Sequence, residues 1–244
     1  MMAGCAMLEP GMRPQAFSDL PERADIPNVA FHSQEDYQCG PAALAMALNW
    51  SGIAVMPHEL VSQVYVPVKK GTLQVEMVGA ARRYGRLAYT INGLESLLIE
   101  LAAGHPVIVL QNLTFNWWPT WHYALVFGYD RESATVIMNS GKTQRYVVDW
   151  RVFVNTWERG EFWGLLVLPP GTLPVTASET SYLESVLGLE HVENFGGAAK
   201  AYAAASERWP ESLGAYMGEG NSLYAIGDLT GAEKAYRKAI FVAP

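Results

Sequence analysis

Cysteine is scarce in this sequence, with two residues in 244, which is too few for a disulfide framework. Long apolar runs are missing, since no stretch approaches the about 18 residues that a transmembrane helix needs. Positive charge is sparse, with 17 Lys and Arg against 24 Asp and Glu and no basic run, which argues against binding nucleic acid or an anionic membrane through a charged face. Apolar residues make up 50% of the chain, which excludes global disorder and suits one medium domain plus a small one.

The N-terminal segment Ala3-Gly4-Cys5 resembles the end of a bacterial lipoprotein signal, in which the cysteine is lipidated after cleavage. The charged and apolar regions that precede such a cysteine are absent, so the alternative is a disordered leader. Residues 8–27 hold four prolines and no periodicity, which is typical of a tether. We therefore expect residues 1–27 to be a flexible leader. Lipidation of Cys5 would place the protein in the bacterial cell envelope as a periplasmic lipoprotein, and otherwise we expect it in the cytoplasm.

Helical patterns come first in the body of the chain and strand patterns follow. A short strand is predicted at 28–33, and helices are predicted at 41–50, 57–65, 74–84 and 94–103. Strands are then predicted at 106–111, 121–129, 134–139, 144–148 and 163–168. Helices followed by an antiparallel sheet indicate an α+β domain over residues 28–168.

The C-terminal part contains an internal repeat. A proline-rich linker is predicted at 169–181, and the region after it is rich in alanine and helical. Four positions recur at an offset of 34 residues, namely Ala198, Tyr202, Ala205 and Pro210, which return as Ala232, Tyr236, Ala239 and Pro244. This spacing resembles two tetratricopeptide-type repeats over 182–244, and the alternative is an accidental alanine-rich hairpin. We expect the end of the second unit, around Tyr236, Ile240 and Phe241, to lack a cover within the chain.

Cys39 stands at the predicted start of the first helix, just before Gly40 and Pro41. A free cysteine is usually a small buried apolar residue, but a helix N-terminus favours a thiolate. We therefore predict a depressed pKa for Cys39. Gln34 lies five residues upstream, and its amide together with the backbone N–H of the nucleophile could form an oxyanion hole.

A nucleophilic thiolate needs a base, and His122 is the best placed of the five histidines. It opens an apolar strand, whereas His32, His58, His105 and His191 lie near turns, in caps or in the repeat region. Asn139 ends the next predicted strand, 17 residues further on, where a hairpin could hold it beside His122. The alternative for Asn139 is a turn residue before Ser140 and Gly141.

Together these residues resemble the bacteriocin-processing, double-glycine-leader cysteine peptidase family of the papain-like clan, over about residues 28–168. The matching residues are Gln34, the block Cys39-Gly40-Pro41-Ala42-Ala43-Leu44, and the strand His122-Tyr123-Ala124-Leu125-Val126 with Gly128-Tyr129-Asp130. The resemblance implies that Cys39 is the nucleophile, His122 the general base, Gln34 the oxyanion donor and Asn139 the orienting residue. Asparagine replaces the aspartate that is usual in the family, and Gln34 is one residue closer to the cysteine than usual.

The expected activity is a cysteine peptidase that acts on a peptide or protein substrate without a cofactor or metal. Trp117, Trp118 and Trp121 lie directly before His122 and are candidates for the wall of a substrate cleft, or for a loop that packs on the domain. The repeats are expected to dock a protein partner. Two alternatives stay open: an inactive peptide-binding module, and a thiol amidase or acyltransferase on a non-peptide amide.

Overall fold

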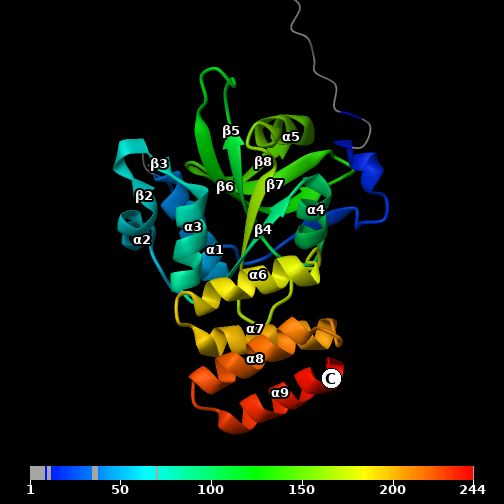
Figure 1. The fold of residues 1–244 in the computed structure, drawn as a ribbon. Coiled ribbons are helices and arrows are strands. Elements are labelled where there is room, and N and C mark those ends of the chain that lie inside the picture. Colours follow the sequence, from blue (N-terminus) through cyan, green and yellow to red (C-terminus); the bar gives the residue numbers. More distant parts are fainter. Residues whose placement is uncertain (1–8, 10–11, 35–37, 70, 244) are drawn as a thin grey trace, which may run out of the picture.

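The computed structural model describes residue 9 and residues 12–34, 38–69 and 71–243. Cys5, the candidate lipidation residue, lies outside them. The described chain forms a three-layered α+β domain, in which helices cover both faces of an antiparallel sheet, and a stack of four helices below it (Figure 1).

The first helical layer contains the predicted N-terminal helices. Its elements are α1 (Cys39–Trp50), α2 (Pro57–Val64), α3 (Gln74–Arg83) and the small hairpin β2 (Tyr65–Val66) and β3 (Gly71–Thr72), joined by η3 (Pro67–Lys69). Pro41 occupies the first turn of α1, where an N–H has no helical partner, and Gly52 follows the helix with φ 92°. Residues 42–48 of α1 are completely or almost completely buried, so this helix forms the centre of the layer.

Seven strands of the described chain build the main sheet. The path runs β4 (Leu87–Asn92), β9 (Trp163–Leu168), β5 (Val107–Asn112), β6 (Trp121–Asp130), β7 (Thr135–Ser140) and β8 (Thr143–Asp149), and β1 (Arg23–Asp25) pairs with β6. Neighbouring strands are antiparallel, as predicted. Side chains of β6 alternate between two apolar clusters: Tyr123 and Leu125 pack with α1, whereas Ala124 and Val126 pack with the opposite layer.

The opposite layer consists of α4 (Leu94–Ala102), α5 (Trp150–Glu158) and the first helix of the C-terminal stack. Asp149 caps α5 by accepting hydrogen bonds from the N–H groups of Arg151 and Val152. Trp150 and Trp157 are buried in this layer. The strand β4 and the helix α5 were not predicted from the sequence.

Part of the predicted leader is structured. Residues 23–25, which were assigned to the leader, form β1, and η2 (Pro14–Phe17) precedes it. A β-bulge shifts the register of β6 between Val126 and Gly128, and a Cβ at Gly128 would lie 2.7 Å from the Ala24 carbonyl oxygen. Glycine at this position therefore allows β1 to approach β6. The strand predicted at 28–33 does not form in these residues, and His32 instead bonds through Nε2 to Asn49 Oδ1 of α1 at 2.7 Å.

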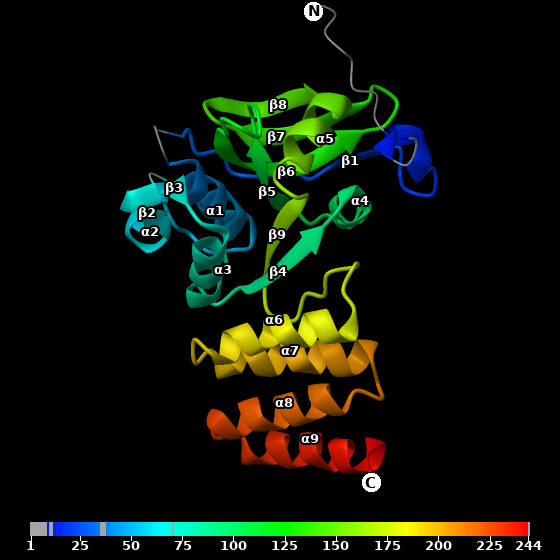
Figure 2. The ribbon, with the colours of Figure 1, turned by 45° about the horizontal axis from the view of Figure 1, so that its top comes forward.

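The C-terminal stack contains α6 (Glu179–Glu190), α7 (Phe195–Arg208), α8 (Leu213–Ala225) and α9 (Leu229–Val242), which lie below the domain in Figure 2. The helices α7 and α9 begin 34 residues apart and end 34 residues apart. Their N-caps, Asn194 and Asp228, have the same offset and bond to Gly197 and Gly231. The Tyr202 ring packs on Gly218 of α8, where a Cβ would collide with it.

The linker does not leave this stack free of the domain. The N–H and Oγ1 of Thr176 both donate to Glu100 Oε1 at 2.7 Å, and Tyr89 of β4 bonds to Ser181 Oγ of α6 at 2.8 Å. Buried residues of α6 and α7 belong to the same apolar cluster as those of β4 and α4. The stack therefore packs directly on β4 and α4 of the domain. None of the described helices combines the length and the hydropathy that crossing a bilayer requires.

Candidate active site

Cys39 is the first residue of α1, and its side chain is half-buried where the helix meets β6. The backbone N–H groups of Tyr123, Gly40 and Cys39 itself lie near enough to the sulfur to favour its thiolate form. A Cβ at Gly40 would collide with the side chain of Thr72. Glycine at this position therefore lets the β2–β3 hairpin pack over the first turn of the helix.

The predicted depression of the Cys39 pKa is wrong. Burial raises the pKa of the thiol, and the nearby backbone N–H groups only partly offset this effect. A helix N-terminus favours the thiolate, but the free-energy cost of removing the thiolate from water is larger here. At neutral pH the resting side chain is therefore a protonated thiol.

His122 lies near the start of β6, directly before Tyr123, whose N–H reaches the Cys39 sulfur. The ring turns away from Tyr123, and its Nε2 lies 2.9 Å from Ser140 Oγ at the end of β7. Burial lowers the pKa of His122, so the imidazole is neutral at neutral pH. Among the described residues, no hydrogen bond joins the Cys39 sulfur to this ring, and both side chains are neutral at neutral pH.

Asn139 has other partners than the histidine. It is 1% exposed, and its Nδ2 donates to the Ala30 carbonyl at 3.0 Å while its Oδ1 accepts the Arg145 N–H at 2.9 Å. These bonds connect the segment before α1 to the strands β7 and β8. The side chain bonded to the His122 ring is Ser140, which the sequence analysis treated only as a turn residue.

Gln34 and Cys39 both lie beside the backbone of Tyr123. The Gln34 side chain is 6% exposed, and its Nε2 donates to the Tyr123 carbonyl oxygen at 3.4 Å. The N–H of the same Tyr123 lies near the Cys39 sulfur. The structure thus brings Gln34, Cys39 and the strand that carries His122 together around Tyr123.

Tyr123 was not singled out as a functional residue. Its side chain is buried against α1, and its hydroxyl donates to the Thr72 carbonyl at 3.2 Å. This bond links the start of β6 to the hairpin that covers Gly40. Burial, together with the nearby Cys39 sulfur, raises the pKa of Tyr123 well above its ordinary value, so the hydroxyl stays protonated and can donate.

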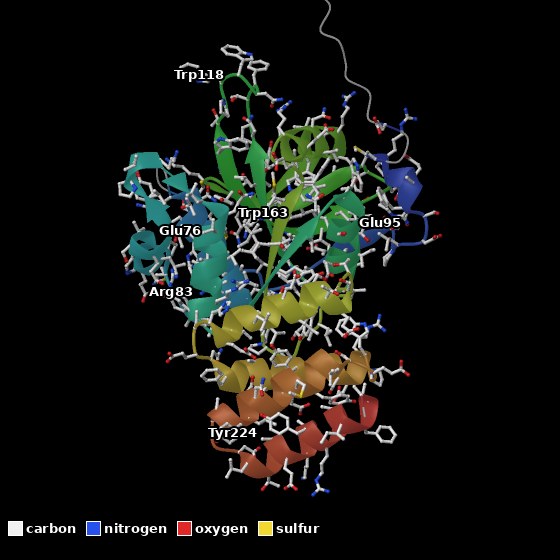
Figure 3. All side chains as sticks on the ribbon, viewed as in Figure 1. Glu76, Arg83, Glu95, Trp118, Trp163 and Tyr224 are labelled. Carbon is white, nitrogen blue, oxygen red and sulfur yellow. The ribbon has the colours of Figure 1, made fainter. Side chains whose placement is uncertain are left out.

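The tryptophans predicted as a cleft wall lie at the loop end of the β5–β6 hairpin and are exposed. Trp117 and Trp118 lie in the β5–β6 hairpin loop and are 78% and 71% exposed, and Figure 3 shows Trp118 at the far tip of that hairpin. Trp121 is the first residue of β6 and is half-exposed beside His122. Within the described residues, no cluster of three or more His, Cys, Asp or Glu side chains is arranged to hold a metal ion.

The raised pKa predicts how Cys39 alkylation depends on pH. In a Cys5→Ser background, where Cys39 is the remaining cysteine, the iodoacetamide rate should inflect above about 8.5, the pKa of an ordinary cysteine. Peptide mapping of the label at each pH provides the measurement, with free cysteine as the reference. An inflection below about 7 would instead indicate a thiolate–imidazolium pair in the resting protein.

Residues 26–162 match a protein family described as the Peptidase_C39 like family. No curated protein matches the chain. A crystal structure described as a C39-like peptidase from Bacillus anthracis is similar with a TM-score of 0.52 at 19% identity, covering 61% of this chain and 98% of that one.

Two further solved structures are similar to the chain. One is the peptidase domain of Streptococcus ComA, a bifunctional ABC transporter involved in quorum sensing, with a TM-score of 0.48, 21% identity, and coverage of 58% of this chain and 99% of that chain. The other is a double glycine motif protease from an AMS/PCAT transporter in complex with its leader peptide, with a TM-score of 0.45, 19% identity, and coverage of 59% and 93%.

Proposed function

Because the chain belongs to the Peptidase_C39 like family, we propose that it is a cysteine peptidase whose nucleophile is Cys39 and whose base is His122. The observation that carries the proposal is the position of Cys39 and Gln34 beside the strand that carries His122. The Tyr123 N–H lies near the Cys39 sulfur, and the Tyr123 carbonyl accepts a hydrogen bond from Gln34 Nε2.

The reaction begins from a neutral thiol and a neutral imidazole. As the sulfur forms a bond to the scissile carbonyl carbon, its proton passes to Nδ1 of His122. Gln34 Nε2 and the Cys39 N–H donate to the developing oxyanion. The carbon–nitrogen bond then breaks, and His122 returns the proton to the departing amine. Water, deprotonated by His122, attacks the thioester, which releases the acid and restores the thiol.

Ser140 serves this scheme as a positioning residue. When His122 Nε2–H donates to Ser140 Oγ, the lone pair lies on Nδ1, which is the tautomer that a base needs. A hydroxyl is neutral and can also donate, so it stabilises an imidazolium less than a carboxylate would.

Selective labelling tests the proposal. A peptidyl chloromethyl ketone should form a thioether on Cys39 with loss of chloride, and mass spectrometry should locate the label on the peptide that contains residue 39. The Cys39→Ala variant should take no label there. The His122→Ala variant should lose this labelling while still reacting with iodoacetamide at pH 9, which shows that its thiol remains accessible. Equal peptidyl labelling of His122→Ala and wild type would contradict the proposal.

Gln34→Ala is expected to lower turnover on the order of 10²- to 10³-fold, because it removes one donor to the oxyanion. The value of KM should change little, since the oxyanion exists only after attack. Steady-state kinetics on a peptide found in a cleavage library provide the measurement. Gln38→Ala, at the N-cap of α1, is the matched control. If this control loses turnover and Gln34→Ala does not, the oxyanion role belongs to Gln38.

The helical stack is proposed to dock a protein partner or substrate near the site. Support comes from the 34-residue offset of its helices and from its direct attachment to the domain through Thr176 and Ser181. The far end of α9 also leaves apolar side chains such as Ile240 without a cover in the chain. Removal of residues 171–244 would test whether peptide cleavage and protein cleavage depend on the stack differently.

A further inference from the structure

The loop of the β5–β6 hairpin gathers exposed apolar side chains at one tip. We call this set the aromatic tip: Leu113, Phe115, Trp117, Trp118 and Trp121, whose exposed fractions are 47, 64, 78, 71 and 52%. The rings of Phe115 and Trp117 stack, with centroids 5.8 Å apart and an interplanar angle of 9°. Figure 3 shows the tip projecting beyond the sheet, at the end of the molecule opposite Tyr224 of α8.

The loop is internally bonded. The side chain of Asn112, which is 1% exposed, accepts the N–H groups of Thr114 and Thr120 at 3.2 and 3.0 Å. Leu113 N–H donates to the Thr120 carbonyl at 2.9 Å, Trp118 N–H donates to the Phe115 carbonyl at 3.0 Å, and Thr114 Oγ1 donates to the Trp118 carbonyl at 2.5 Å. Much of the loop backbone therefore has partners without water. This arrangement is required of a loop that enters a medium of low polarity.

The tip and the strand residues next to it carry no formal charge. Residues 101–129 contain no Asp, Glu, Lys or Arg, although charged residues make up 17% of the whole chain. A surface that recognises a charged peptide would need opposite charges here, and none are present. The exposed side chains are instead indoles, a phenyl ring and a leucine. Indoles concentrate at membrane–water interfaces because each combines an apolar body with one polar N–H group.

We propose that the aromatic tip inserts into the interface of a lipid bilayer and holds the protein against the membrane surface. The tip projects from the molecule, so it fits a deformable lipid surface better than a flat protein surface. The net charge of −7 makes an anionic headgroup layer unfavourable, so the apolar side chains provide the attraction. The proposal does not depend on the peptidase activity, because it concerns side chains outside the Cys39–His122 pair.

Vesicle flotation of the full chain tests this proposal. A Cys5→Ser background keeps any acyl group at Cys5 out of the measurement. The protein should float with phosphatidylcholine vesicles, and the bound fraction should change little between low and high salt because the tip is uncharged. Addition of phosphatidylglycerol should not increase binding. The Trp117→Ala/Trp118→Ala variant should lower the partition coefficient at least about tenfold, since two large apolar side chains lose their burial.

A matched control separates the tip from general surface hydrophobicity. Tyr224 is 64% exposed and lies at the opposite end of the molecule, so Tyr224→Ala should bind vesicles like the parent chain. Thermal melting of each variant checks that the fold is unchanged. Failure of the parent chain to float would overturn the proposal, as would equal binding by the double variant. Loss of binding in Tyr224→Ala, or binding that requires phosphatidylglycerol and disappears in salt, would also overturn it.

Discussion

A Cys39→Ala variant is expected to lose peptide cleavage on the order of 10⁶-fold, and a His122→Ala variant about 10²- to 10⁴-fold. Alanine at 39 removes the atom that forms the thioester. Alanine at 122 leaves a protonated, buried thiol without an acceptor for its proton, because burial raises the pKa of Cys39. Release of new N-termini from a peptide library, followed by kinetics on the fastest peptide, measures both losses.

Substitutions of Ser140 are expected to have smaller effects on turnover than those of Cys39 and His122. Ser140→Ala removes one hydrogen bond to the His122 ring, which corresponds to about 1 kcal/mol, or roughly fivefold in turnover. Ser140→Asp places a carboxylate beside Nε2, which should raise the pKa of His122 and move the acidic limb of the pH profile upward. Wild-type turnover in Cys39→Ala would show that another residue is the nucleophile.

A Glu100→Ala variant is expected to destabilise the fold by about 3 kcal/mol, which lowers Tm by roughly 6–12 °C in a chain of this size. The Glu100 side chain is completely buried, and it accepts hydrogen bonds from the Thr176 N–H, from Thr176 Oγ1 and from His105 Nδ1, each at 2.7 Å. Alanine leaves these groups without their acceptor. Calorimetry measures the shift, and Glu95→Ala, on the exposed side of the same helix, should stay within about 0.5 kcal/mol.

This destabilisation should depend on pH. Burial alone raises the pKa of Glu100, but hydrogen bonds from His105 and Thr176 outweigh it, so the pKa in the folded protein lies below its ordinary value. A carboxylate with a lowered pKa stabilises the fold above its unfolded pKa of about 4.3, and this contribution is lost as the pH falls through the folded pKa. The Tm difference between wild type and Glu100→Ala should therefore shrink below about pH 4. A constant difference would show that the charge of Glu100 contributes little.

Elements with strong local signals could be predicted from the sequence. The helix α1 follows from Pro41 in its first turn and an alanine- and leucine-rich run before Gly52. The strand β4 was missed because its partner β9 lies about 75 residues downstream, so no hairpin signal marks it. The helix α5 was missed because its valines and aromatic residues have weak helix propensity, and burial on the sheet with the Asp149 cap overcomes it.

The partner of the His122 ring depends on how β6, β7 and β8 are aligned, and this alignment could not be predicted from the sequence. Successive residues of a strand point to opposite faces, so a shift of one residue decides whether position 139 or 140 lies beside the ring. The shift in β6–β7 pairing between Val126 and Gly128, and the second one in β7–β8 between Met138 and Ser140, have no clear local signature. Cys39 and Gln34 needed no such register, because one helix start and one short segment bring both to Tyr123.

The protonated state of the Cys39 sulfur also affects how the protein meets oxidants. Peroxides and disulfides react with thiolates, and a thiol whose pKa is raised by burial presents little thiolate at neutral pH. The resting chain should therefore resist conversion of Cys39 to a sulfenic acid or a mixed disulfide. Sensitivity should appear only while a bound substrate draws the proton toward His122. A thiol that stays protonated at rest can remain reduced without the reducing conditions that most thiol enzymes require.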